Sequence, residues 1–154
     1  MATFEYEEIL SRLLTKIEAY DFIDMTNNQI EEYLSDWIKS VSANPYLRKQ
    51  FSSLTIDGDS SEITFELSYP IDDGYDQDFV IELFSLGVGL KWLQPKINSI
   101  QHIAQLFGSN DEKFYSQKEH LSGLLELQKR WKKEFDDLLH GRGYLFNTYL
   151  DGES

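Results

Sequence analysis

The stretch FVIELFSLGVGLKWL, residues 79–93, decides the fold of this chain because it places apolar side chains around nearly the whole circumference of a helix. A helix of this kind is buried on most of its sides, so other elements of the fold must cover it. We expect it to span residues 75–93 and to end before Pro95, since proline cannot continue the backbone hydrogen bonding of a helix.

Two glycines lie inside this predicted helix, where each costs about 1 kcal/mol relative to alanine. Gly87 and Gly89 are therefore expected to serve a close approach of backbones, either at a helix crossing within the chain or at a tight contact between subunits. Trp92 belongs to the same packed surface. A flexible kink at the glycines is the competing explanation.

Two helices are predicted before this segment. Residues 4–18 carry apolar side chains at helical spacing, with Thr3 available as the N-cap. Residues 26–29, TNNQ, fit a capping box, and the apolar positions that follow continue at helical spacing to Val41. This second helix is expected to end before Pro45.

A β-hairpin insert is predicted at residues 51–71. Apolar and polar residues alternate there, which is typical of strands that bury one face. The simplest pairing joins 54–57 to 62–68 through the turn DGDSS at 57–61. This turn exceeds the two-residue ideal, so the alternation does not fix the register.

After Pro95 the sequence predicts a short helix at 99–107, followed by Gly108 at its C-terminal cap position. A second capping box, SQKE at 116–119, opens a long helix that ends near Gly141. Residues 142–154 form a tail. We therefore expect one domain, 1–154, that is mainly α: a bundle of about five helices with a small β-hairpin insert.

The charge of the chain is unevenly distributed. Residues 1–90 hold 18 acidic and 5 basic residues, whereas residues 91–154 hold 9 of each. The acidic part should repel phosphate backbones, which disfavours specific nucleic-acid binding. The basic run at 129–133 is diluted by neighbouring acids and is predicted to be a solvated helix face. There is no cysteine, and no apolar run reaches the ~20 residues of a membrane span.

The residues that carry chemistry form no recognisable catalytic set. His102, His120 and His140 lie in no metal-binding spacing, and no nucleophile elbow or phosphate-binding loop occurs. The acidic run at 57–62 begins like a calcium loop but lacks its full spacing and its final glutamate. A second acidic cluster could hold a metal but is also typical of the N-terminal cap region of the buried helix: Asp72, Asp73, Asp76 and Asp78. We expect no catalytic residue, no metal and no cofactor; a hydrolase with an acidic site would need a divalent metal.

The segment DFVIELFSLGVGLKWLQPKI, residues 78–97, resembles a family of small tailed-bacteriophage proteins of the head–tail connector, or neck. Members of that family carry an acidic stretch, then "LALGM-x-x-EWL-x-PKV", then a long C-terminal helix with a basic, aromatic tail. Residues 6–17, 20–22, 114–116 and 130–135 follow the same pattern in order. This chain departs from it in a longer insert at 51–71 and a less basic tail.

The resemblance implies a non-enzymatic adaptor subunit that joins the portal protein to neighbouring neck or tail proteins. Such a virion protein is made in the host cytoplasm and forms a homo-oligomeric ring, without membrane contact, through which DNA passes. In this ring the acidic cluster Asp72, Asp73, Asp76 and Asp78 is the candidate channel-facing surface.

The tail is the candidate docking segment for the portal because its apolar and aromatic side chains are suited to anchoring. These residues are Tyr144, Leu145, Phe146, Tyr149 and Leu150. Folding of the tail back onto its own domain is an equally open reading. The alternative function is a small acidic regulatory or inhibitory binding protein, such as a DNA mimic or an immunity-type protein.

Overall fold

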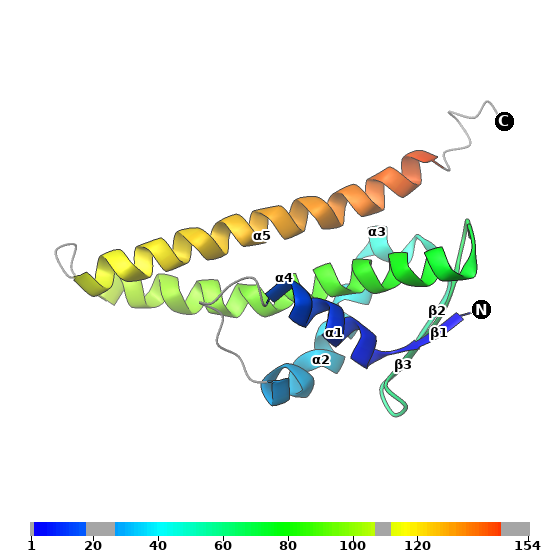
Figure 1. Ribbon diagram of the computed structural model, residues 1–154, viewed down its shortest axis with the longest axis horizontal. Helices are drawn as coiled ribbons and strands as arrows, with labels where there is room; N and C mark the ends of the chain where they lie inside the picture. Colours follow the sequence, from blue (N-terminus) through cyan, green and yellow to red (C-terminus); the bar gives the residue numbers. More distant parts are fainter. Residues whose placement is uncertain (1, 18–26, 107–111, 146–154) are drawn as a thin grey trace.

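The computed structural model describes residues 2–17, 27–106 and 112–145, and within these ranges the chain forms five helices and three strands (Figure 1). In chain order they are β1 (Ala2–Glu5), α1 (Tyr6–Ile17), α2 (Asn27–Ser42), α3 (Pro45–Arg48), β2 (Phe51–Asp57), β3 (Glu62–Leu67), α4 (Asp73–Leu106) and α5 (Glu112–Leu145). The protein is mainly helical with a small antiparallel sheet, which confirms the predicted class at that level.

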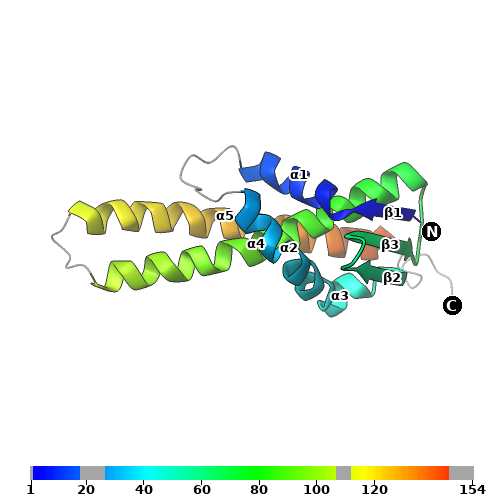
Figure 2. The same ribbon diagram turned by 90° about the horizontal axis from the view of Figure 1, so that it is seen from below.

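The two longest helices, α4 and α5, lie side by side and antiparallel (Figures 1 and 2). The shorter helices and the sheet gather along one half of this pair, the half that contains the start of α4 and the end of α5. The other half extends past them. We call the elements β1 to β3 and α1 to α3, with the half of the pair they cover, the body, and the remaining half the projecting pair.

Helix α4 is the centre of the core, since it contacts α1, α2, α5 and β1. Its side chains from Phe79 to Val88 are buried almost without interruption, and Trp92, Leu93 and Ile97 extend the buried surface. The prediction that residues 79–93 form a helix covered on nearly all sides is therefore confirmed.

Gly87 and Gly89 let neighbouring helices approach α4 within the chain. A Cβ atom on Gly87 would lie 2.6 Å from a methyl carbon of Val41 in α2. A Cβ atom on Gly89 would lie 2.8 Å from the Trp131 ring in α5 and 3.1 Å from Leu13 in α1. The distances of 2.6 and 2.8 Å are shorter than real Cβ contacts, so the intramolecular crossing explains both glycines, and neither needs a subunit contact or a kink.

Pro95 does not end the buried helix, contrary to the prediction; α4 runs through it to Leu106 and includes residues 99–106 of the separate helix expected at 99–107. The expected cap at Gly108 lies outside the described residues. The proline removes one backbone hydrogen bond, but side chains on both sides hold the helix together. Gln94 donates to Asn98 at 2.9 Å across the proline and accepts from Gln128 of α5 at 2.7 Å. Ile97 is buried on the far side of the proline.

The hairpin of β2 and β3 is confirmed, with a longer first strand than predicted and a register shift between Phe51 and Ser53. The turn accommodates a positive φ of 55° at Ser61 and is held by the Asp57 carboxylate, which accepts from the backbone N–H groups of Asp59 and Ser60. Within the described ranges this hairpin belongs to a three-stranded sheet in the order β1-β3-β2.

Strand β1 was not predicted, because residues 4 and 5 were assigned to the first helix and Thr3 to its cap. Instead Ala2–Glu5 pair with β3, and the Thr3 hydroxyl hydrogen-bonds to that of Thr64 at 3.0 Å. The Phe4 ring packs edge-on against Phe65, with centroids 5.9 Å apart. Pairing with the open edge of β3 outweighs the local helical pattern, and α1 begins at Tyr6.

Two helix boundaries also differ from the predictions. Pro45 follows the end of α2, as expected, but it also opens the short helix α3, because Asn44 caps the N–H groups of Tyr46 and Leu47. Helix α5 begins at Glu112 rather than at the capping box and continues past Gly141 to Leu145. The first four residues of the predicted tail are therefore helical.

Candidate functional site

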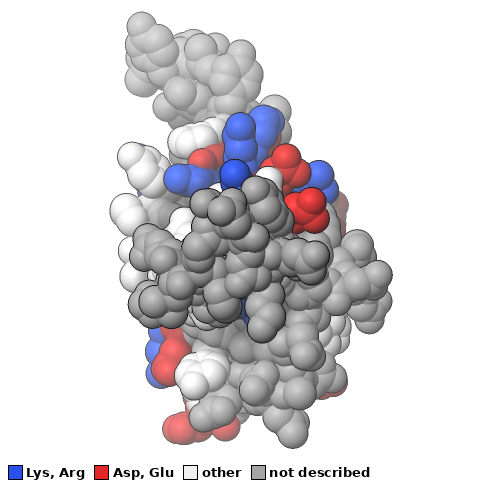
Figure 3. Space-filling model, turned by 90° about the vertical axis from the view of Figure 1, so that its left-hand side faces the viewer, with Lys and Arg blue, Asp and Glu red and all other residues white. Residues whose placement is uncertain are grey.

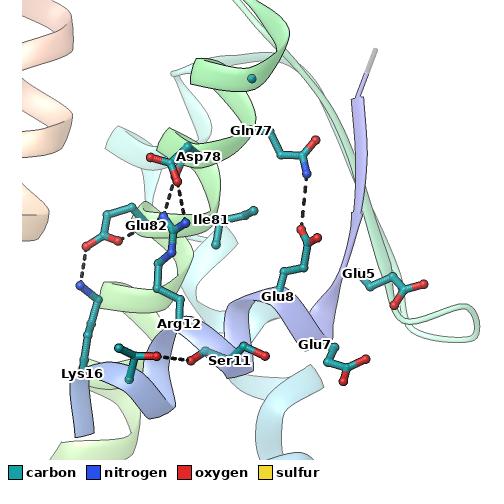
Figure 4. A pocket seen from close by; sticks show the side chains of 12 residues that line it. Glu5, Glu7, Glu8, Ser11, Arg12, Lys16, Gln77, Asp78, Ile81 and Glu82 are labelled. Atoms are coloured by element: carbon teal, nitrogen blue, oxygen red, sulfur yellow. Dashed lines mark hydrogen bonds and ion pairs between the residues drawn. The ribbon is translucent and has the colours of Figure 1, made fainter. Parts of the chain in front are cut away.

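An open groove of about 910 Å³ lies between α1 and the start of α4 (Figure 4). Arg12 and Lys16 are one helical turn apart on α1, and Asp78 and Glu82 are one turn apart on α4, so the two pairs face each other. Arg12 contacts the Asp78 carboxylate, donates to the Asp78 carbonyl at 3.1 Å and reaches Glu82 at 3.3 Å, while Lys16 pairs with the other oxygen of Glu82.

Four charged residues of this groove, which we call the Arg12 cluster, pair with one another: Arg12, Lys16, Asp78 and Glu82. Burial alone would lower the pKa of Arg12, but its hydrogen bonds and proximity to Asp78 and Glu82 outweigh burial and raise the pKa above its ordinary value. Arg12 therefore stays protonated, and the cluster connects α1 to α4. Glu5, Glu7 and Glu8 form an acidic rim and make no ion pair with any other described residue, so the groove as a whole is acidic.

The four predicted channel-facing aspartates have different structural roles. Asp72 caps α4 by accepting from the N–H of Tyr75 at 2.8 Å, and Asp78 pairs with Arg12. Asp76 is only 5% exposed, and both of its carboxylate oxygens accept from the N–H of Ile71 at 3.1 Å. A buried carboxylate cannot line a channel, so Asp76 leaves the candidate set; Asp72, Asp73 and Asp78 are exposed at the start of α4.

A second groove, of about 1070 Å³, lies between α4, α5 and the segment that joins α2 to α3. Its apolar lining comes from Val41, Pro45, Leu90, Leu125 and Phe135. Tyr46 and three lysines also line it: Lys91 of α4 and Lys129 and Lys132 of α5. We call it the lysine groove.

Sequence reasoning missed the lysine groove. It assigned Lys129 and Lys132 to a solvated face, and only the pairing of α4 with α5 brings Lys91 beside them. Seen from the end of the projecting pair, basic and acidic side chains lie side by side over α5 (Figure 3). The exposed face of this helix is therefore mixed in charge, as predicted for a solvated surface.

The predicted docking segment falls largely outside the described residues. The backbones of Tyr144 and Leu145 belong to α5, and the positions of Phe146, Tyr149 and Leu150 lie beyond it. Trp92 is buried in the core, with the Lys96 ammonium 5.1 Å from its ring centroid. Trp92 therefore packs within its own chain, as part of the core.

Histidine and carboxylate side chains are not arranged as a metal site: in the described part of the chain no three of them gather closely enough to hold an ion. The His140 ring instead lies 6.1 Å from the ring of Tyr46. Among the helices of the described ranges, none combines the length and apolarity that crossing a membrane requires.

Comparison of the chain with protein-family models, curated proteins and solved structures finds no match.

Proposed function

We propose that this protein is a head–tail connector subunit of a tailed bacteriophage, which joins the portal to the tail during virion assembly. The observation that carries the proposal is the projecting pair. Helices α4 and α5 have 34 residues each, which makes each roughly 50 Å long. The body covers only one half of that length (Figures 1 and 2).

Because the projecting pair extends past the body, it can contact neighbouring subunits in a ring. A ring of identical subunits needs two different surfaces on each copy, because each interface joins unlike faces. The body and the projecting pair provide two such surfaces, with the helices packed as a bundle around α4 inside each subunit. The resemblance of residues 78–97 to phage connectors supports the same role.

The charge distribution supports a non-enzymatic role beside DNA. The acidic rim of Glu5, Glu7 and Glu8 lies close to the exposed aspartates at the start of α4. A surface of this sign repels a passing duplex and does not retain it. The Arg12 cluster pairs its own charges and offers no activated nucleophile or base.

The experiment is reconstitution with the portal protein encoded in the same genome. Mass photometry of the mixture should show portal rings whose mass rises by a whole number of copies of this chain. The mass of the chain alone serves as the reference. A monomer in this sample is compatible with the proposal, because the ring can form only on the portal. Portal rings of unchanged mass at micromolar concentrations of both proteins would contradict it.

The same acidic rim favours one second candidate, a small acidic binding protein that masks a basic partner, such as a DNA mimic or an immunity-type inhibitor. Five exposed or half-exposed carboxylates surround the α1–α4 groove: Glu5, Glu7, Glu8, Asp78 and Glu82. Under this function the chain forms a stable one-to-one complex with a basic enzyme and leaves portal rings unchanged. Mass measurement of both mixtures separates the two functions.

A further inference from the structure

The lysine groove brings three positive charges together in a strongly acidic chain. Lys91, Lys129 and Lys132 are exposed, and across the described residues none of them forms an ion pair. Lys133, their neighbour on α5, behaves differently, since it pairs with Asp137 at 2.8 Å. The groove lining contains three lysines and one carboxylate, that of Asp136, in a chain whose net charge is −13, so the groove is locally positive.

Apolar surface lies open between these lysines. Leu125 is 40% exposed and Tyr46 is 64% exposed, while Val41 and Phe135, which also line the groove, are buried. A partner side chain placed against Leu125 and Tyr46 would remove this surface from water, which is favourable. The groove thus combines an apolar floor with a cationic rim, the usual composition of a site for a short amphipathic segment.

The walls of the groove are held in place by contacts within the chain. Asn44 caps α3 and fixes the turn that carries Tyr46. The Gln94–Gln128 hydrogen bond of 2.7 Å joins α4 to α5. The close approach permitted at Gly87 brings α4 against α2 and α5. The groove therefore exists before a ligand arrives, which lowers the entropic cost of binding.

We infer that the lysine groove binds an acidic segment of a partner protein, in which one large apolar side chain is flanked by carboxylates. The positive charge of the three lysines favours a negatively charged segment, and the exposed side chains of Leu125 and Tyr46 favour an apolar anchor within it. A nucleic-acid backbone fits less well, because its phosphates gain nothing from the exposed apolar surface of Leu125.

The test is to select peptides from a displayed library of random 12-residue sequences on the folded full-length chain. Enriched peptides should share an aromatic or leucine residue flanked by Asp or Glu. Isothermal titration with one synthesised peptide should show affinity at least about tenfold weaker for Lys91→Gln/Lys129→Gln/Lys132→Gln, because three charge pairs are lost. Leu125→Ser alone should also weaken binding, since it removes the anchor contact.

The matched control removes three other exposed lysines, Lys39→Gln/Lys118→Gln/Lys133→Gln, and should leave the affinity within about twofold because these side chains lie outside the groove. Circular dichroism checks that each variant folds; Lys129→Gln/Lys132→Gln replaces the triple variant if that one does not. The inference is overturned if no common peptide class is enriched, if the groove variants bind the peptide as the native chain does, or if a dT12 oligonucleotide binds the groove more tightly than the peptide.

Discussion

At the residue scale, the two glycines of α4 set how closely four helices can pack. Gly87 faces Val41 and Phe135, and Gly89 faces Trp131 and Leu13, so one missing side chain at each position serves two neighbours. Both contacts involve buried side chains with little freedom to move; Val41 in particular is β-branched and stiff at χ1. The crossing should therefore be sensitive to a single methyl group.

Gly87→Ala should destabilise the protein by about 1–2 kcal/mol, since overpacking outweighs the better helix propensity of alanine. Gly141→Ala is the matched control, because no atom lies within 4 Å of a Cβ built there. It should stabilise the protein by about 0.5–1 kcal/mol. Urea unfolding measures both. Equal signs for the two substitutions would refute the close-crossing explanation.

The Asp57 carboxylate should make the hairpin sensitive to acid. Its hydrogen bonds from Ser60 and Asp59 lower the pKa of Asp57 below its ordinary value. A lowered pKa in the folded state means that this stabilisation is present above the ordinary pKa of an aspartate, about 3.9, and is lost as the pH falls through the folded-state value.

Asp57→Ala should therefore lower the unfolding midpoint at pH 7, and the difference from the native chain should shrink steadily below about pH 4. Thermal unfolding followed by circular dichroism across this range provides the measurement. Asp59→Ala, in the same turn, is the control. A difference that stays constant with pH would show that the carboxylate charge plays no part.

At the scale of elements, α4 depends on side-chain contacts to continue through Pro95. Pro95→Ala should stabilise the protein by about 1–2 kcal/mol, because the backbone N–H regained at this position outweighs the lost restriction of the unfolded chain. Chemical denaturation measures the gain. A loss of stability would instead mean that α4 needs the bend imposed by proline for its packing on α5.

Helix α1 is held to α4 by Arg12 as well as by the core. Arg12→Met should destabilise the protein by about 0.5–1 kcal/mol, a modest figure because the side chain is 30% exposed and solvent screens its pairs. Lys133→Met removes a fully exposed pair and should change little. Hydrogen exchange of α1 amides locates the effect. Equal exchange in the two variants would argue against the Arg12 cluster as a connection between these helices.

The sequence predicted those elements whose pattern is local. The periodicity of α1 and α2, the alternation of β2 and β3 and the apolar circumference of α4 all depend on residues close together in the chain. Strand β1 escaped prediction because its partner β3 lies about sixty residues away. The passage of α4 through Pro95 depends in part on Gln128 of another helix, and the lysine groove depends on Lys91 meeting Lys129 and Lys132. Such features become visible only in three dimensions.

At the scale of the whole molecule, the net negative charge is concentrated in the body, and the projecting pair is nearly neutral. The first 90 residues, which carry the net negative charge, build most of the body, whereas α5 and the end of α4 are balanced in charge. One end of the molecule is thus acidic and the other is a nearly neutral helix pair. This division suits a subunit whose two ends meet different surroundings in an assembly.

The measurement that tests the connector proposal most directly is cryo-electron microscopy of the chain incubated with the portal protein of the same genome. The account predicts a ring of added density on the portal, in which each repeat shows a pair of long antiparallel helices extending past a smaller body. Portal particles that carry no added layer, while the chain remains folded in solution, would contradict it.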